Sequence, residues 1–200
     1  DYLLPDVALV SPVMTLTCPR SVTAASGVDA LVHAVESYLS VNASPITDAL
    51  AIGAIKLIAK ALPKAYANPA DLVAREDMAT ASLMAGMAFG NAGVGAVHAL
   101  AYPLGGRFNI AHGVSNALLL PYVMEFNMAT ATKKYAEVAL ALGCEKQYTD
   151  AATAAAGVQK IRALNRACGI PGRHHTTGCS EQTRISGSPP ILSPFVRASC

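Results

Sequence analysis

A chain of 200 residues is long enough to bury a hydrophobic core and short enough for a single domain. Its composition, 52% hydrophobic and 14% charged, excludes a disordered or collagen-like protein. The net charge is only +2, and the basic residues are scattered along the chain, so we expect no nucleic-acid partner.

The five cysteines are an odd number and contain no CxxC pair, which argues against a disulfide framework and against a thiolate zinc site. The first residues, Asp1 to Pro5, contain neither a basic leader nor an apolar run ending in small residues, so no secretory signal is predicted. We therefore expect a reducing, cytoplasmic location. The chain begins with Asp1 rather than methionine, as a piece of a longer polypeptide would.

Helical periodicity dominates the chain. The one strand-like segment is Val7 to Val10, and because a single short strand cannot form a sheet, we expect it to pair with an element outside this chain. After it, Ala-rich segments repeat apolar residues at spacings of three and four, which predicts seven helices and an all-α fold. The predicted helices are Val22 to Ser40, Pro45 to Tyr66, Pro69 to Phe89, Val94 to Leu104, Gly113 to Phe126, Thr130 to Leu142 and Asp150 to Cys168.

Helix ends carry their own signals. Ser44 and Asn68 each precede a proline, which predicts a capping side chain followed by proline at the first helical position. Gly143 and Gly169 stand where a helix end favours a left-handed residue.

A long stretch from Met78 to Gly106 contains no acidic or basic residue except His98. Its length would permit a membrane span, but it is rich in Gly and Ala and is interrupted at Pro103. We predict two buried helices joined at Asn91 to Gly95 instead, with the Gly93-Val94-Gly95 segment as a tight turn, and no membrane partner.

The composition changes near Gly172 from Ala-rich helical sequence to Arg, Ser, Thr, Pro and Cys. We therefore divide the chain into a helical domain, residues 1–172, and an irregular tail, residues 173–200. The tail is either disordered or loosely docked, or it is sequence foreign to the fold, and we favour the second alternative. His174, His175 and Cys179 have metal-ligand side chains, but in a segment without periodicity we expect no metal site there.

Three histidines and one aspartate lie in the best-patterned part of the chain. Asp29 and His33 are four residues apart, so a helix places both side chains on one face. His98 lies on an apolar helix, and His112 follows a predicted turn at Gly105 and Gly106, at the entrance to the next helix. One carboxylate and three imidazoles form a ligand set that suits ferrous iron or zinc and leaves a position open for substrate. Taken singly, each histidine is more typical of a core residue bonded to the backbone.

Two longer motifs carry a family resemblance. The first runs from Thr23 to Tyr38 and includes Gly27-Val28-Asp29-Ala30-Leu31-Val32-His33-Ala34-Val35-Glu36; the second runs from Ala85 through His98-Ala99-Leu100-Ala101-Tyr102-Pro103-Leu104-Gly105-Gly106 to His112-Gly113 and Asn116. Together they resemble the iron-containing (group III) alcohol dehydrogenases over about residues 3–171. The resemblance implies a helical bundle like the C-terminal metal-binding half of the dehydroquinate synthase-like/iron-containing alcohol dehydrogenase fold.

Carried over position by position, the family's metal ligands fall on Asp29, His33, His98 and His112. The resemblance implies Fe²⁺, with Zn²⁺ as the other possibility, and hydride transfer between a small alcohol or carbonyl substrate and NAD or NADP. Many family members have a second histidine four residues after His98; here the position is Tyr102, which we keep as a candidate catalytic residue able to form a hydrogen bond.

The sequence departs from the family in a larger respect. The family's N-terminal α/β half, with its glycine-rich pyrophosphate turn, is not found in this sequence. The cofactor-binding residues therefore stay unknown, and we expect little or no turnover by this chain alone.

Two other hypotheses stay open. One is a non-catalytic metal-binding helical module that associates with itself, because an uncovered apolar face favours a homo-oligomer. The other is an ordinary helical bundle whose polar residues bond one another without a metal. Glu36, three residues after His33, either orients a ligand or is a solvated or tail-paired glutamate.

Overall fold

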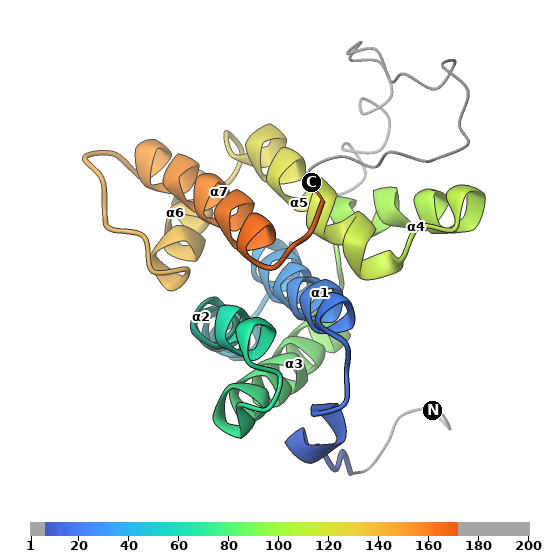
Figure 1. Cartoon of the computed structure of the whole chain (residues 1–200). Coiled ribbons are helices and arrows are strands. Elements are labelled where there is room, and N and C mark those ends of the chain that lie inside the picture. The colour runs from blue at the N-terminus through green and yellow to red at the C-terminus, as the bar shows by residue number, and fades with distance from the viewer. Residues whose placement is uncertain (1–6, 172–200) are drawn as a thin grey trace.

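The computed structural model describes residues 7–171 (Figure 1). Within this range the regular secondary structure is helical, with no strand, which confirms the all-α prediction. A short 3-10 helix, Pro12–Thr15, precedes seven α-helices: α1, Arg20–Leu39; α2, Pro45–Ala67; α3, Leu72–Ala92; α4, Ala96–Phe108; α5, His112–Asn127; α6, Thr132–Ala141; and α7, Asp150–Ala167.

Helix α1 runs through the middle of the bundle and contacts α2, α3, α5 and α6 (Figure 1). Twelve of its residues are buried, among them the fully covered Val28, Leu31 and Val35. Burying side chains of this size contributes about 1.5–3 kcal/mol each to folding. Because neighbours surround α1, its polar residue Glu36 is buried, and Asp29 and His33 are partly buried.

Of the four residues predicted to cap or end helices, three are confirmed. Ser44 caps α2 in a capping box with Thr47, and Gly143 and Gly169 have φ of 84° and 67°, as predicted. The prediction for Asn68 is wrong: α3 begins at Leu72, and the Asp71 side chain accepts from the Ala74 amide. Asn68 instead accepts a hydrogen bond from the Ala70 amide and forms the preceding turn.

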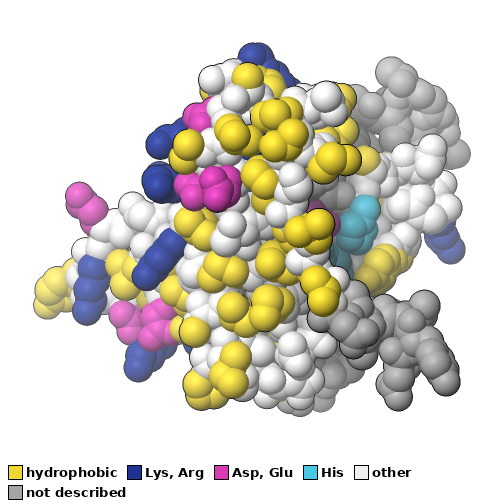
Figure 2. All heavy atoms as spheres, turned by 90° about the horizontal axis from the view of Figure 1, so that it is seen from below, with side chains coloured by type: hydrophobic (Ala, Val, Ile, Leu, Met, Phe, Trp, Pro, Cys, Tyr) yellow, Lys and Arg dark blue, Asp and Glu magenta, His cyan; other side chains and the backbone are white. Residues whose placement is uncertain are grey.

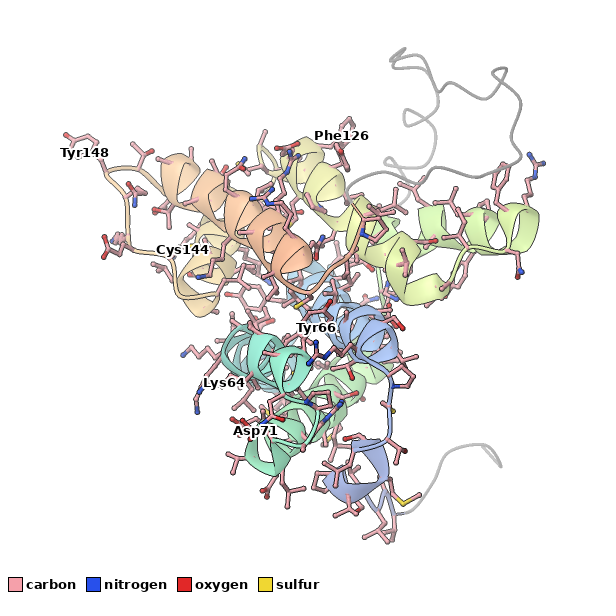
Figure 3. The ribbon with its side chains drawn as sticks, in the orientation of Figure 1. Lys64, Tyr66, Asp71, Phe126, Cys144 and Tyr148 are labelled. Atoms are coloured by element: carbon pink, nitrogen blue, oxygen red, sulfur yellow. The ribbon has the colours of Figure 1, made fainter. Side chains whose placement is uncertain are left out.

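The C-terminal end of α7 packs close to α2. Figure 3 shows Tyr66 of α2 lying near that end, where a Cβ on Gly169 would collide with the tyrosine hydroxyl. Gly169 therefore meets two requirements at once, its left-handed backbone and the space that Tyr66 occupies.

The strand expected at Val7 to Val10 does not form within residues 7–171, and its pairing with an element outside this chain stays a prediction. These residues have no regular secondary structure, and Val7 and Leu9 are 82% and 95% exposed. An isolated strand leaves its amides and carbonyls unpaired, and residues 7–171 offer no strand with which it could pair.

The uncharged stretch from Met78 to Gly106 forms parts of two helices, as predicted, and Gly93 turns the chain between them with φ of 81°. Within residues 7–171 no single helix is long and apolar enough to cross a membrane; α3 and α4 meet that criterion only as a pair, which is bent by 102°. The expectation that both helices are buried is wrong. α4 buries only Val97, His98 and Ala101, and α3 buries six of its 21 residues, because neighbours cover one side of each helix.

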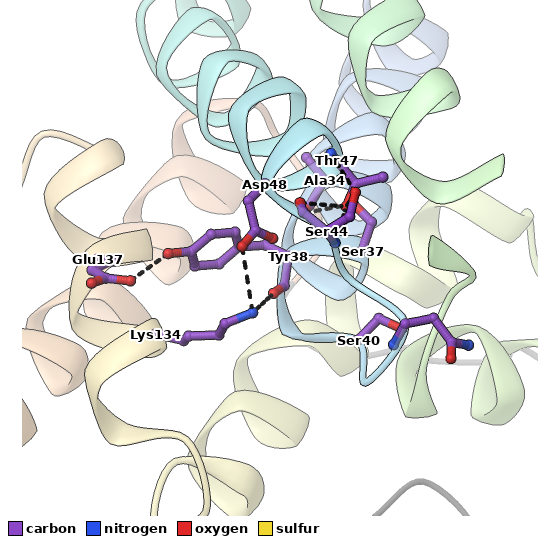
Figure 4. Close-up of polar contacts among 10 residues, drawn as sticks. Ala34, Ser37, Tyr38, Ser40, Ser44, Thr47, Asp48, Lys134 and Glu137 are labelled. Carbon is purple, nitrogen blue, oxygen red and sulfur yellow. Dashed lines mark hydrogen bonds and ion pairs between the residues drawn. The ribbon is translucent and has the colours of Figure 1, made fainter. Parts of the chain in front are cut away.

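A polar junction joins α1, α2 and α6 away from the histidines (Figure 4). The Tyr38 hydroxyl donates to Glu137 of α6. Lys134 donates to the Tyr38 carbonyl at 2.7 Å, lies over the Tyr38 ring and reaches Asp48 of α2 at 3.8 Å. This junction fixes the C-terminal end of α1 against two helices and supports the rest of α1 in its central position.

Candidate metal centre

Three helices bring the four predicted ligands to one place. Asp29 and His33 lie one turn apart on α1, His98 lies in the first turn of α4, and His112 is the first residue of α5. Asp29, His33 and His98 each offer a ligand atom, and these atoms lie within 4.8 Å of one another. His112 Nε2 lies 3.8 Å from Asp29 Oδ1, which places the fourth residue at the edge of the group.

His98 is the most buried of the four, with a side chain that is 2% exposed. Its Nδ1 lies 2.6 Å from Glu36 Oε2, while its Nε2 is buried without a hydrogen-bond partner, 3.8 Å from Asp29 Oδ1. A buried polar atom without a partner costs about 1–3 kcal/mol. A cation between Nε2, Asp29 and His33 would satisfy that atom, so the residues present fit a metal ion.

His33 is stacked between two rings, with centroid distances of 4.3 Å to Phe89 and 4.5 Å to His98. Burial lowers the pKa of His33, and the opposing attraction of Asp29 does not cancel that effect. A lowered pKa favours the neutral imidazole, which is the form that binds a metal ion.

Asn116 of α5 is a polar neighbour that the sequence analysis quoted in a motif without giving it a role. It is buried, its Nδ2 donates to Asp29 Oδ1, and the same nitrogen lies 3.0 Å from His112 Nε2. The sequence did contain a signal for this role: Asn116 follows His112 by one helical turn and therefore lies on the same helix face. Asn116 therefore holds the carboxylate of α1 beside the histidine of α5.

The exposed side of the site contains His112 and Tyr102. Their rings are stacked at a centroid distance of 5.7 Å, and Tyr102 is 61% exposed. Figure 2 shows a histidine side chain at the surface in a recess between hydrophobic side chains. The turn predicted at Gly105 and Gly106 is wrong, because both residues are helical. α4 continues to Phe108, and the next residue, Asn109, has a left-handed φ of 51°.

Glu36 was predicted either to orient a ligand or to be a solvated or tail-paired glutamate, and the structure favours the first alternative. The side chain is buried, Oε1 accepts a 2.6 Å hydrogen bond from the Val97 amide, and Oε2 contacts His98. It therefore orients a residue of the cluster, but that residue is His98 of α4 rather than His33 on its own helix. His174, His175, Cys179 and the tail predicted at 173–200 lie outside the described residues.

The pattern described as "Fe-containing alcohol dehydrogenase family, C-terminal" matches residues 23–185, a range that includes all four cluster residues. The chain belongs to this family. Its relatives include long-chain-alcohol dehydrogenase 1 of Geobacillus thermodenitrificans, which is 61% identical over 143 residues, or 72% of this chain and 36% of that protein.

Two solved structures show the same helical fold over the part that this chain matches. The crystal structure of 1,3-propanediol oxidoreductase superposes with a TM-score of 0.83 at 45% identity, over 84% of this chain and 44% of that one. The sulfoacetaldehyde reductase of Bifidobacterium kashiwanohense, solved in complex with NAD⁺, gives a TM-score of 0.80 at 31% identity, over 94% of this chain and 50% of that one. This chain thus spans half or less of the length of these relatives.

Proposed function

We propose that Asp29, His33, His98 and His112 hold one divalent cation, Fe²⁺ or in its place Zn²⁺, in a cytoplasmic NAD(P)-dependent alcohol dehydrogenase. The substrate in this proposal is a small alcohol, or the corresponding aldehyde or ketone in the reverse direction. The family's iron-containing character and the NAD⁺ complex of a relative support the choice of cation and cofactor.

The observation that carries the proposal is the unpartnered, buried Nε2 of His98, beside Asp29 and His33. A helical bundle that uses no metal would leave this nitrogen unsatisfied at a free-energy cost, which argues against the metal-free hypothesis. When bound, the cation acts as a Lewis acid toward an alcohol or carbonyl oxygen, and the nicotinamide accepts or supplies the hydride.

The chain's own residues divide the remaining work. Asn116 donates to Asp29 and keeps its carboxylate turned toward the histidines. Phe89 covers one face of the His33 ring and excludes water from it. In this proposal Tyr102, exposed and stacked on His112, forms a hydrogen bond through its hydroxyl at the open side of the site.

The metal content of the chain tests the proposal. We expect about one equivalent after anaerobic loading with ferrous ion, and almost none in His98→Ala, because this substitution removes the buried nitrogen ligand. Elemental analysis after desalting gives the metal per chain, and far-UV circular dichroism checks that the variant is still helical. Absence of metal from the loaded wild type, or equal metal in both proteins, would contradict the proposal.

A second candidate function is a metal-binding module that associates with itself as a homo-oligomer. Large apolar side chains are exposed on α4 and α5, namely Tyr102, Phe108, Tyr122 and Phe126, and Figure 3 shows Phe126 pointing away from the bundle. Burying them between two copies would gain hydrophobic free energy.

Sedimentation velocity over about a hundredfold range of concentration tests whether the chain associates with itself through this surface. We expect the average mass of the chain to rise with concentration. A constant monomer mass would exclude self-association through these side chains.

A further inference from the structure

Both carboxylate oxygens of Glu36, on α1, contact residues in the first turn of α4. Its Oε1 accepts from the Val97 amide at 2.6 Å, and its Oε2 lies 2.6 Å from His98 Nδ1. The side chain is only 5% exposed, so solvent does not compete for either oxygen. One carboxylate thus fixes both the backbone at the beginning of α4 and the ring of the buried histidine.

We propose that Glu36 is a positioning residue that holds His98 in the tautomer protonated at Nδ1. A carboxylate accepts hydrogen bonds and has no proton to donate, so the Nδ1 that faces it carries the proton. In a neutral imidazole the lone pair then lies on Nε2, the buried atom that faces Asp29 and has no partner. The inference rests on the proposed function, because a metal ion is what would use that lone pair.

Gly95 supplies the space that this arrangement needs. Its φ of −120° is open to any residue, but a Cβ there would lie 3.0 Å from Glu36 Oε1. The carboxylate could yield only by lengthening its two short hydrogen bonds. A side chain at this position would therefore disturb the two hydrogen bonds of Glu36.

Glu36→Gln is a sharp test because it changes hydrogen bonding with almost no change in shape. The Val97 amide remains a donor, so the new amide must turn its oxygen toward Val97 and its NH₂ group toward His98. Nδ1 would then have to accept, and the proton would move to Nε2. We expect the tautomer of His98 to reverse in the metal-free chain.

Long-range ¹H–¹⁵N correlation NMR of the metal-free chain reports which ring nitrogen carries the proton, with the His98 signals assigned by their loss in His98→Ala. Zn²⁺ affinity is measured in parallel by competition with a chromophoric chelator. We expect Glu36→Gln to bind Zn²⁺ about 10–100-fold more weakly than the wild type. Glu137→Gln is the matched control: it makes the same change where the carboxylate faces only the Tyr38 hydroxyl, and should alter neither readout.

An unchanged His98 tautomer in Glu36→Gln, or a wild-type Zn²⁺ affinity, would overturn the inference. If the wild type binds no Zn²⁺, the proposed function fails, whereas the tautomer measured without metal still decides the role of Glu36. Gly95→Ala answers the question should Glu36→Gln not fold: it should weaken Zn²⁺ binding, while Gly90→Ala, whose Cβ meets no atom within 4 Å, should not.

Discussion

Replacing Gly113 by alanine is expected to lower the free energy of unfolding by about 3 kcal/mol. Gly113 is the second residue of α5, and a Cβ there would overlap the backbone carbonyl of Ala25 on α1. A flexible side chain could move aside, but a helix backbone cannot, so α5 must shift away from α1. The neighbouring His112 would move with α5, and metal affinity should fall as well.

Urea unfolding of the metal-free chain, followed by circular dichroism, measures this effect. Gly86→Ala is the matched control, because Gly86 lies inside α3 and a Cβ there meets no atom within 4 Å. That variant should gain about 0.5–1 kcal/mol from the lower entropy of its unfolded chain. Equal stability of Gly113→Ala and the wild type would show that α1 and α5 are not packed this closely.

Zn²⁺ is expected to stabilise the wild-type chain strongly and to have almost no effect on Asp29→Asn. A ligand that binds only the folded state raises the free energy of unfolding by about 4 kcal/mol when its free concentration is about a thousand times its Kd. Asn keeps the shape of Asp29 and can still accept from Asn116, but it removes the one anionic ligand of the cluster.

The measurement is chemical unfolding with and without Zn²⁺, in both proteins. Asp77→Asn serves as the control, since Asp77 pairs at 3.5 Å with the exposed Lys60 outside the cluster and its loss should leave the metal effect intact. Equal stabilisation of wild type and Asp29→Asn would exclude Asp29 as a ligand. Little change between the two metal-free proteins is expected, because Asn116 still has its acceptor.

Part of the metal cluster could be predicted from the sequence alone. Asp29 and His33 share a helix face because of their spacing, which requires no knowledge of the rest of the fold. The inclusion of His98 and His112 in the same set depended on the family resemblance, and the structure then brings both to Asp29 at 3.8 Å. That the four bind a metal stays a prediction.

The partner of Glu36 and the end of α4 could not be predicted from the sequence. The sequence predicted that Glu36 lies near the cluster, but it did not predict the contact with His98, because His98 lies on another helix. The turn expected at Gly105 and Gly106 failed because two glycines lower helix propensity without forbidding a helix, and α4 continues to Phe108.

The sequence by itself determined the helices, most of their ends and the family, because periodicity, capping side chains and long motifs are local properties of the chain. Only the tertiary structure decided which polar groups meet: α1 buried at the centre, α4 covered on one side, and the unpartnered nitrogen of His98 turned toward Asp29. These contacts join residues far apart in the chain, and their geometry follows from how whole helices pack, which no local pattern encodes.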